Sequence, residues 1–362
     1  MKKSLLALAA IGFAGAVSAQ SSVTLFGIVD ATLAFGKGSV ANRTQLTNSG
    51  YNSARLGFRG NEDLGGGAQG GFWLEAGLTN DDGTGAGTNV NNQAVAATAS
   101  TVRPGTQGLT FNRRATVSLG GGWGEVRLGR EYTPHFWNHT VYDPFGTNGV
   151  GTTQTLNSSI GGPTTVRASN SITYLFGHAF NGTSVGGGGL HVMVQHFRGE
   201  NLQNGATTAG DGTGTSLRVG YGAGPFSAAF ATGTTKFGSG NIRTTNLGAH
   251  FDLGFVDLMA IYDRDVVSRG LTGKGYLLGG VAPLGQGALR FAYSRYETNA
   301  AGTPASKKYS LGYVYNLSKR SAIYTTLARV SNNGGAAQSL NGAATAANKN
   351  STGYDFGLRH VF

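Results

Sequence analysis

Apolar and polar residues alternate along most of this chain. In the last nine residues, 354–362, one parity holds Tyr, Phe, Leu, His and Phe, and the other holds Asp, Gly, Arg and Val. Successive side chains of an extended strand point to opposite faces of a sheet. The stretch therefore predicts a strand with one largely apolar face and one face that carries charge.

The same alternation predicts sixteen strands. Their expected ranges are 22–35, 55–59, 72–78, 114–119, 125–130, 167–176, 190–198, 217–221, 226–236, 243–252, 255–266, 274–282, 287–298, 308–315, 321–331 and 354–362. Seven short connections rich in Gly, Asn, Asp or Pro, such as 62–67, are expected to alternate strictly with eight long polar ones. With an even number of strands, both chain ends lie on the side of the short turns.

Regular alternation of this kind is typical of an outer-membrane β-barrel, which has short turns at one end, long loops at the other and apolar residues facing lipid. A closed barrel pairs every backbone group without an exposed edge. We therefore predict an all-β, 16-stranded antiparallel transmembrane barrel. The alternative is a secreted β-sandwich or adhesin array, whose buried faces would not require so regular an alternation of loop lengths.

The first nineteen residues have the features of an export signal. Lys2 and Lys3 precede an apolar stretch at 5–17, and small residues end at Ala19. That order is the pattern of a cleaved secretory signal. Later segments all fall short of the roughly 18 uninterrupted apolar residues that a membrane helix needs. We expect a signal peptide at 1–19, export to the outer membrane of a Gram-negative bacterium, and one multi-pass barrel at 20–362.

Composition and charge narrow the function. The 362 residues include 62 glycines and no cysteine, so a disulfide scaffold is excluded and glycine is expected in turns and tight packing. The 28 basic and 17 acidic residues give a net charge of +11. Since Lys and Arg never run beyond pairs, a nucleic-acid partner is not expected. An anionic solute or an anionic surface fits the charge better.

A barrel of sixteen strands is wide enough for an aqueous channel unless something fills it. The longest predicted loop, 131–166, contains Phe136, Trp137, Tyr142 and Phe145, an aromatic content that favours packing against the inside of the wall. Charge at the resulting narrowing would set the preference among ions. By parity the arginines that face the lumen are Arg55, Arg59, Arg114, Arg127, Arg167, Arg218 and Arg290, against the acids Glu75, Glu125 and Asp257. This excess predicts a preference for anions.

Several motifs together resemble those of the general diffusion porins of Gram-negative outer membranes, in the anion-preferring branch typical of β-proteobacteria. They are SVTLFGIVD at 22–30, SARLGFRG at 53–60, EDLGGG at 62–67, GFWLE at 71–75, RRATVSL at 113–119, GEVRLGR at 124–130, LGYVYNLSK at 311–319 and GLRHVF at 357–362. The resemblance spans essentially the whole chain after the signal. It implies a water-filled channel for passive diffusion of small anionic or neutral solutes, without cofactor, metal or catalysis.

The resemblance also implies a homotrimer, with the third external loop folded into each pore. Matched position by position, the constriction residues are Arg55, Arg113, Arg114, Arg167, Glu75 and Asp143. The parity of the strand places Arg114 inward, whereas the motif points to Arg113, and a β-bulge would reconcile the two. Other implied partners are outer-membrane lipid, lipopolysaccharide and the barrel-assembly machinery, the last through the terminal Phe362.

Rival functions remain. A solute-specific channel for phosphate or small organic anions would show saturable block by one solute, and a barrel enzyme or adhesin would show turnover or surface binding. His135 and His139 are spaced for a helical metal site, but no cysteine is present and the nearest carboxylates are Glu131 and Asp143. No Gly-x-Ser-x-Gly motif stands at a strand-to-helix turn. We therefore interpret these histidines as ordinary loop residues and the protein as a channel rather than an enzyme.

Overall fold

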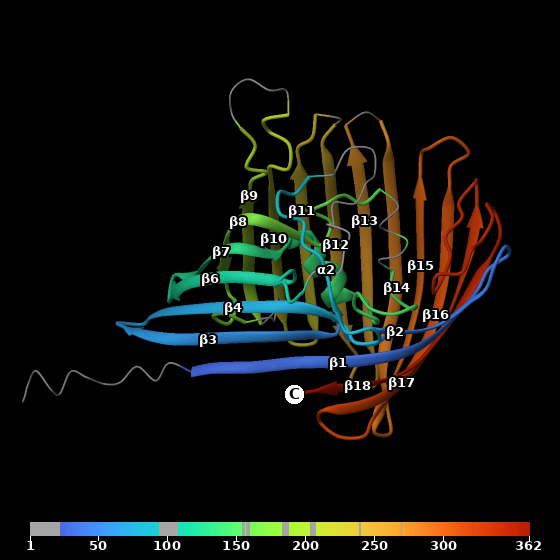
Figure 1. Cartoon of the computed structure of the whole chain (residues 1–362), viewed down its shortest axis with the longest axis horizontal. Coiled ribbons are helices and arrows are strands. Elements are labelled where there is room, and N and C mark those ends of the chain that lie inside the picture. The colour runs from blue at the N-terminus through green and yellow to red at the C-terminus, as the bar shows by residue number, and fades with distance from the viewer. Residues whose placement is uncertain are drawn as a thin grey trace, which may run out of the picture.

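The computed structural model describes residues 22–93, 108–153, 156, 160–182, 188–202, 208–238, 240–268 and 270–362. The signal peptide expected at 1–19 lies outside these residues. The described chain is almost entirely one antiparallel sheet that closes on itself (Figure 1).

Sixteen strands form the wall of the barrel. They are β1 Ser22–Lys37, β3 Arg55–Gly65, β4 Ala68–Thr79, β6 Arg114–Gly121, β7 Gly124–Tyr132, β8 Arg167–Phe176, β9 Gly189–Phe197, β10 Gly214–Ala223, β11 Phe226–Thr235, β12 Ile242–Asp252, β13 Asp257–Val267, β14 Thr272–Leu284, β15 Gly287–Thr298, β16 Ala305–Asn316, β17 Ser321–Asn333 and β18 Ser351–Val361. Each wall strand pairs with its neighbours in sequence, and β18 pairs with β1 to close the barrel. The predicted fold is confirmed.

Two short strands lie in the connections. β2 (Arg43–Asn48) pairs with residues 31–36 of β1, whereas β3 pairs with residues 22–28 of the same strand. β5 (Thr84–Gly85) pairs with the end of β4. The alternation of apolar and polar residues did not predict either strand, because each is short and neither carries a continuous apolar face.

Wall strands extend further than the sequence pattern predicted. β3 continues to Gly65, so its turn to β4 is confined to Gly66 and Gly67 instead of occupying 62–67. Both residues have positive φ, at 60° and 80°, which favours glycine. Residues 61–65 are exposed and mainly polar on both faces, so the periodicity that marks a lipid-facing strand stops before the strand does.

The expected strict alternation of connection lengths is wrong in one half of the barrel. The connections β11–β12, β13–β14 and β15–β16 occupy only 236–241, 268–271 and 299–304. By contrast, the β8–β9 connection, expected to be a short turn, spans 177–188. The long connections cluster between β1 and β8, at β9–β10 and at β17–β18. Strand length accounts for two of the three, since β14 and β16 begin earlier than predicted. The β11–β12 connection has the length that the predicted strand bounds leave for it.

The predicted faces of the strands are confirmed. In β6, Val117 and Leu119 are 57% and 51% exposed on the outer face, whereas Arg114 is buried on the inner face. In β18, Tyr354, Phe356 and Leu358 face outward, and Asp355 is buried on the opposite side. The sheet therefore presents an apolar surface outward and collects charged side chains inside.

A helix in the long β7–β8 connection packs on the inner face of the wall. α2 (Pro134–Tyr142) begins with proline at its first position, where the missing N–H costs no hydrogen bond. Tyr142, the last residue of the helix, and Phe145 beyond it pack against inward-facing residues of four wall strands, Ala229, Ile261, Leu277 and Ala292. Asn138 Nδ2 donates to Ala229 O and to Asn246 Oδ1, each at 2.8 Å. Within the described ranges, no helix is long and apolar enough to cross a membrane.

Candidate functional site

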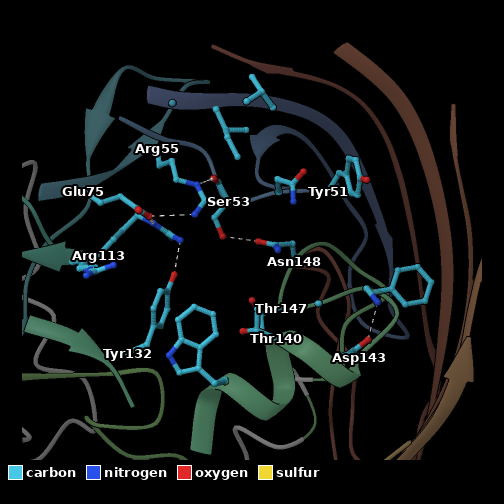
Figure 2. A pocket seen from close by; sticks show the side chains of 18 of the residues that line it. Tyr51, Ser53, Arg55, Glu75, Arg113, Tyr132, Thr140, Asp143, Thr147 and Asn148 are labelled. Carbon is cyan, nitrogen blue, oxygen red and sulfur yellow. Dashed lines mark hydrogen bonds and ion pairs between the residues drawn. The ribbon is translucent and has the colours of Figure 1, made fainter. Parts of the chain in front are cut away.

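A cavity of about 630 Å³ lies between the inner wall and residues 134–153, which we call the α2 segment (Figure 2). Its lining comes from the segment 137–148, from residues 51–53, and from the wall strands β1, β3, β4, β6, β7, β13, β14, β15 and β18. The charged side chains that line it are Arg55, Arg59, Arg113, Arg114, Arg290, Glu75, Glu131 and Asp143. Five arginines thus face three acids.

Glu75 holds two of these arginines. Its carboxylate, on β4, is 3% exposed and accepts hydrogen bonds from Arg55 Nη1 at 3.2 Å and from Arg113 Nε at 2.5 Å. Trp73 Nε1 donates to its other oxygen at 3.0 Å. Charge-assisted bonds of this kind are stronger than neutral ones. The arrangement fixes the direction of both guanidinium groups and offsets one of their two charges.

Tyr132, at the end of β7, joins the wall to α2. Its hydroxyl accepts hydrogen bonds from Arg113 Nη2 at 2.6 Å and from Arg167 Nη2 at 2.7 Å. The Arg167 guanidinium lies 4.3 Å from the centre of the Tyr132 ring, a cation–π distance. The same ring stacks on Phe136 of α2 at 5.2 Å. We call Arg55, Glu75, Arg113, Tyr132 and Arg167 the Tyr132 cluster.

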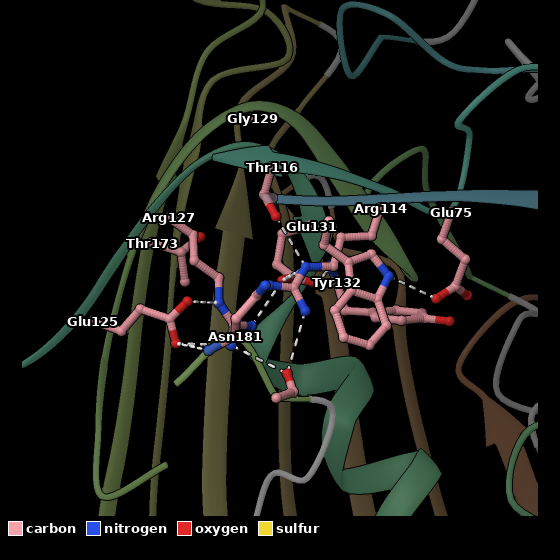
Figure 3. Close-up of polar contacts among 12 residues, drawn as sticks. Glu75, Arg114, Thr116, Glu125, Arg127, Gly129, Glu131, Tyr132, Thr173 and Asn181 are labelled. Carbon is pink, nitrogen blue, oxygen red and sulfur yellow. Dashed lines mark hydrogen bonds and ion pairs between the residues drawn. The ribbon is translucent and has the colours of Figure 1, made fainter. Parts of the chain in front are cut away.

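A second group of charges is paired within itself (Figure 3). Glu131 Oε2 lies 3.1 Å from Arg114 Nε and 2.9 Å from Arg127 Nη1. Arg127 Nε also lies 2.7 Å from Glu125 Oε1. Asn181 Oδ1 accepts from Arg114 Nη2 at 2.9 Å. We call Arg114, Arg127, Glu125 and Glu131 the ion-pair network, and all four side chains are at most 4% exposed.

A third group lies around Tyr51, whose side chain lines the cavity together with Arg290. The Tyr51 ring has the Arg290 guanidinium 4.3 Å and the Arg359 guanidinium 4.9 Å from its centre. Arg359 Nη1 donates to Asn52 Oδ1 at 3.2 Å. Among the ion pairs within the described ranges, none involves Arg290 or Arg359. We call these three residues the Tyr51 cluster.

Asp143 follows α2 and lines the cavity from the loop side. Its Oδ1 accepts from Phe145 N at 2.8 Å, and its Oδ2 accepts from Thr153 N at 2.8 Å. Burial raises the pKa of this carboxyl to about 6, against the opposing effect of the two backbone hydrogen bonds. Asp143 therefore shapes its own loop, rather than orienting the wall arginines directly as Glu75 does.

The comparisons with known proteins agree with this geometry. Residues 4–335 match the family model described as Gram-negative porin. The chain belongs to the Gram-negative porin family. It is 35% identical to the outer membrane porin protein 32 of Delftia acidovorans, with both chains covered completely. It is 27% identical to an outer membrane porin protein of Bordetella pertussis, over 90% of this chain and 93% of that one.

A solved structure matches this porin closely. The anion-selective porin from Comamonas acidovorans superposes with a TM-score of 0.80 at 31% identity, over 95% of this chain and 100% of that chain. OmpT of Vibrio cholerae, in its trimer form, matches with a TM-score of 0.64 at 11% identity, which shows a shared fold. The protein is an outer-membrane β-barrel channel.

The structure places both candidate arginines of the 113–114 pair inside this porin. β6 begins at Arg114, so Arg113 precedes the strand and strand parity does not apply to it. Its backbone N–H donates to Glu75 O at 3.0 Å, which turns its side chain toward the Glu75 carboxylate. The β4–β6 register runs without a shift from Gln69 to Glu75 and ends at Arg114, so the bulge that would reconcile the two arginines stays a prediction. Arg113 and Arg114 belong to different groups.

Sequence reasoning missed Glu131, Tyr132, Tyr51 and Arg359 as members of these groups. Glu131 was assigned to the loop because β7 was expected to end at residue 130. The strand in fact continues to Tyr132 through an irregular register between Gly129 and Glu131. Arg359 shares the inward parity of Asp355 in β18, and that signal was available from the sequence.

The histidine pair of α2 does not resemble a metal site. His139 Nε2 lies 3.0 Å from Asp263 Oδ1, and His135 Nε2 lies 3.2 Å from Thr133 Oγ1. Burial, together with the neighbouring His139, lowers the pKa of His135 to about 4. The described part of the chain contains no group of three metal-ligating side chains. The His139 contact anchors α2 to β13, and the His135 contact lies at the start of the helix itself.

Proposed function

We propose that this outer-membrane channel passes small hydrophilic solutes by passive diffusion with a preference for anions, and that it is not an enzyme. The observation that carries the proposal is the excess of five arginines over three acidic side chains around the cavity. The anion-selective porin from Comamonas acidovorans supports it by similarity. The proposed constriction residues are Arg55, Arg113, Arg114, Arg167, Glu75 and Asp143.

The mechanism follows from where the charge is fixed. Arg113 donates to Glu75 and Tyr132, and Arg167 donates to Tyr132. These hydrogen bonds hold both guanidinium groups against the wall and out of the path of solutes. A unit charge in water attracts an anion about 4 Å away by about 1 kcal/mol. Attraction of that size concentrates anions without trapping them, which is what conduction requires.

The α2 segment is proposed to set the size limit. It packs on the inner face of the wall through Asn138, Tyr142 and Phe145. Its far edge then forms one side of the cavity opposite the Tyr132 cluster. A solute of low mass and either negative or zero charge fits this arrangement.

Assembly and export are also proposed. Leu25 and Val29 of β1 are 55% and 39% exposed on the outer face, which is a surface suited to contact between three copies of the chain. Other proposed partners are outer-membrane lipid and the barrel-assembly machinery, the latter through the terminal Phe362. Residues 1–19 are proposed to be removed during export.

The test is the reversal potential of the purified protein in a planar bilayer under a salt gradient. An anion-signed potential is the expected result, with unitary steps in threes for a trimer. A cation-signed potential would overturn the charge argument. Saturable block by phosphate or one organic anion would favour a solute-specific channel, and absence of conductance would favour an enzyme or adhesin.

A further inference from the structure

Arg218 of β10 lies behind α2, apart from the cavity that Arg55 and Arg113 line. The helix packs on the inner face of β10, β11 and β12 (Figure 1). Its Asn138 Oδ1 accepts a hydrogen bond from Arg218 Nε at 2.7 Å. Arg218 is fully buried and does not line the cavity. Strand parity therefore faced this arginine inward correctly, but helix and wall together enclose it away from the lumen.

The positive charge of Arg218 has no acidic partner in the described part of the chain. None of the ion pairs found there involves this arginine. Both terminal nitrogens of the guanidinium, Nη1 and Nη2, are buried and lack a hydrogen-bond partner among the described residues. The neighbour that acts on the guanidinium electrostatically is the hydroxyl of Tyr142, an uncharged group. Since a buried charge without a counter-charge is strongly destabilising, this site needs a source of negative charge.

Other buried polar groups beside Arg218 indicate the same need. Ser216 and Gly220 lie on either side of it on the inner face of β10, and Ser216 Oγ has no partner within the described ranges. His191 of β9 lies opposite Gly220, and a Cβ added at Gly220 would come within 2.1 Å of the unpartnered His191 Nε2. This imidazole and Arg218 act on each other electrostatically. Buried polar groups are almost always hydrogen-bonded, and an ordered ion or water accounts for many exceptions.

These groups together suit a small anion better than water. The terminal nitrogens of Arg218, the Ser216 hydroxyl and, in the tautomer protonated there, His191 Nε2 are all hydrogen-bond donors. A buried water molecule satisfies donors but leaves the charge uncompensated. The residue opposite Arg218 on β11 is Ala231, whose side chain adds no competing acceptor. Because α2 covers the guanidinium, an anion of one atom fits this place more readily than a carboxylate or a phosphate.

We propose that Arg218, Ser216 and His191 bind a chloride ion enclosed between α2 and β10. The ion balances the charge of Arg218 and so allows this arginine to hold Asn138 of the helix at the wall. The site lies apart from the proposed constriction residues. Its role is therefore to fasten the α2 segment, which is distinct from the passage of solutes through the lumen.

Bromide, which replaces chloride and scatters anomalously, locates the ion in crystals of the folded, detergent-solubilised protein. A peak beside Arg218 Nη1 and Nη2 is expected in the wild type. Arg218→Met removes the charge but keeps a long side chain, and it is expected to lose the peak. The matched control, Arg290→Gln, removes an arginine that lines the cavity and should leave this peak in place.

Unfolding in solution measures the same ion through its linkage to stability. Chloride replaces gluconate at constant ionic strength, so that general screening is unchanged. One ion released on unfolding should lower the unfolding equilibrium constant about tenfold for each tenfold rise in chloride above its Kd. Wild type and Arg290→Gln should show this dependence, and Arg218→Met should lose it. Ser216→Ala keeps the charge and should weaken chloride binding, so it tests the site even where Arg218→Met does not fold.

Several results would overturn the proposal. Bromide peaks in the cavity with none beside Arg218 would assign the buried donors to water. A peak or a chloride dependence that survives in Arg218→Met would place the ion elsewhere. Equal loss of the dependence in Arg290→Gln would assign it to anions in the lumen, and binding by Ser216→Ala equal to that of wild type would contradict the proposed ligands.

Discussion

Arginines in the ion-pair network and arginines in the Tyr51 cluster face the same interior but have different surroundings. Arg114 and Arg127 are matched by two carboxylates, with four side chains that are nearly inaccessible to water. Arg290 and Arg359 stack on Tyr51 and have no ion pair within the described ranges. The first arrangement has no net charge, and the second carries two.

This difference predicts which arginines stabilise the wall and which act on permeating ions. A buried pair contributes to the wall only while both partners remain, because an isolated buried charge is costly. An arginine held by an aromatic ring keeps its whole charge while its direction is fixed. The Tyr132 cluster lies between these cases, because three arginines share the single carboxylate of Glu75 and the hydroxyl of Tyr132.

The largest effect is expected from Glu131→Gln in the ion-pair network. The change leaves Arg114 and Arg127 without their shared partner, and the free energy of unfolding should fall by roughly 3–5 kcal/mol. Denaturant-induced unfolding from lipid vesicles measures it, with Glu62→Gln at an exposed position as the matched control. Loss of less than about 1 kcal/mol, the value of an exposed pair, would show that the network is not stabilising.

A large change in selectivity, with little change in stability, is expected from Arg290→Gln and Arg359→Gln. Each removes about 1 kcal/mol of attraction for an anion, so the ratio of anion to cation permeability should fall about fivefold per arginine. Reversal potentials in a salt gradient measure this ratio. Lys37→Gln, on the outer face, is the control that should leave it unchanged. If Lys37→Gln lowered the permeability ratio equally, the charges that control selectivity would lie outside the Tyr51 cluster.

A smaller effect is expected from pH through Asp143. Since burial raises its pKa to about 6, the carboxyl becomes neutral as pH falls from 7 to 5. The cavity then loses one negative charge, so the preference for anions should increase on acidification. The raised pKa also links Asp143 to stability. Its contribution to the stability of the folded loop is fully present below the pKa of the unfolded chain and is lost as pH rises through about 6.

The Asp143→Asn variant is the control for this pH effect. It should show the acidic level of anion preference at both pH values. A pH response of unchanged size in the variant would assign it to His139, whose pKa is raised by the nearby Asp263 despite its burial.

Strand parity predicted the fold and the inward faces because lipid outside and water inside impose a period of two. It placed Glu75, Arg114 and Arg127 correctly. It could not place Arg113, which precedes its strand, or assign Glu131, which follows an irregular pairing at Gly129. Nor could it tell that Arg114 is neutralised whereas Arg290 is not, because pairing depends on strands far apart in sequence. The failed alternation of loop lengths has a separate origin at β14 and β16, which begin earlier than the apolar pattern indicates.

The attachment of the α2 segment has a consequence for the order of assembly. Val150 N donates to Asp355 Oδ2 of β18 at 2.8 Å, and the Lys308 ammonium of β16 donates to the carbonyls of Val150 and Thr152. Those anchors come from the last sixty residues of the chain, while the segment itself is less than halfway along it. Contacts so distant in sequence form late, because the intervening chain must be ordered first. The contacts of Asn138, Tyr142 and Phe145 with β11–β15 can form earlier, whereas the stretch at Val150 and Thr152 is fixed only when β16 and β18 are in place.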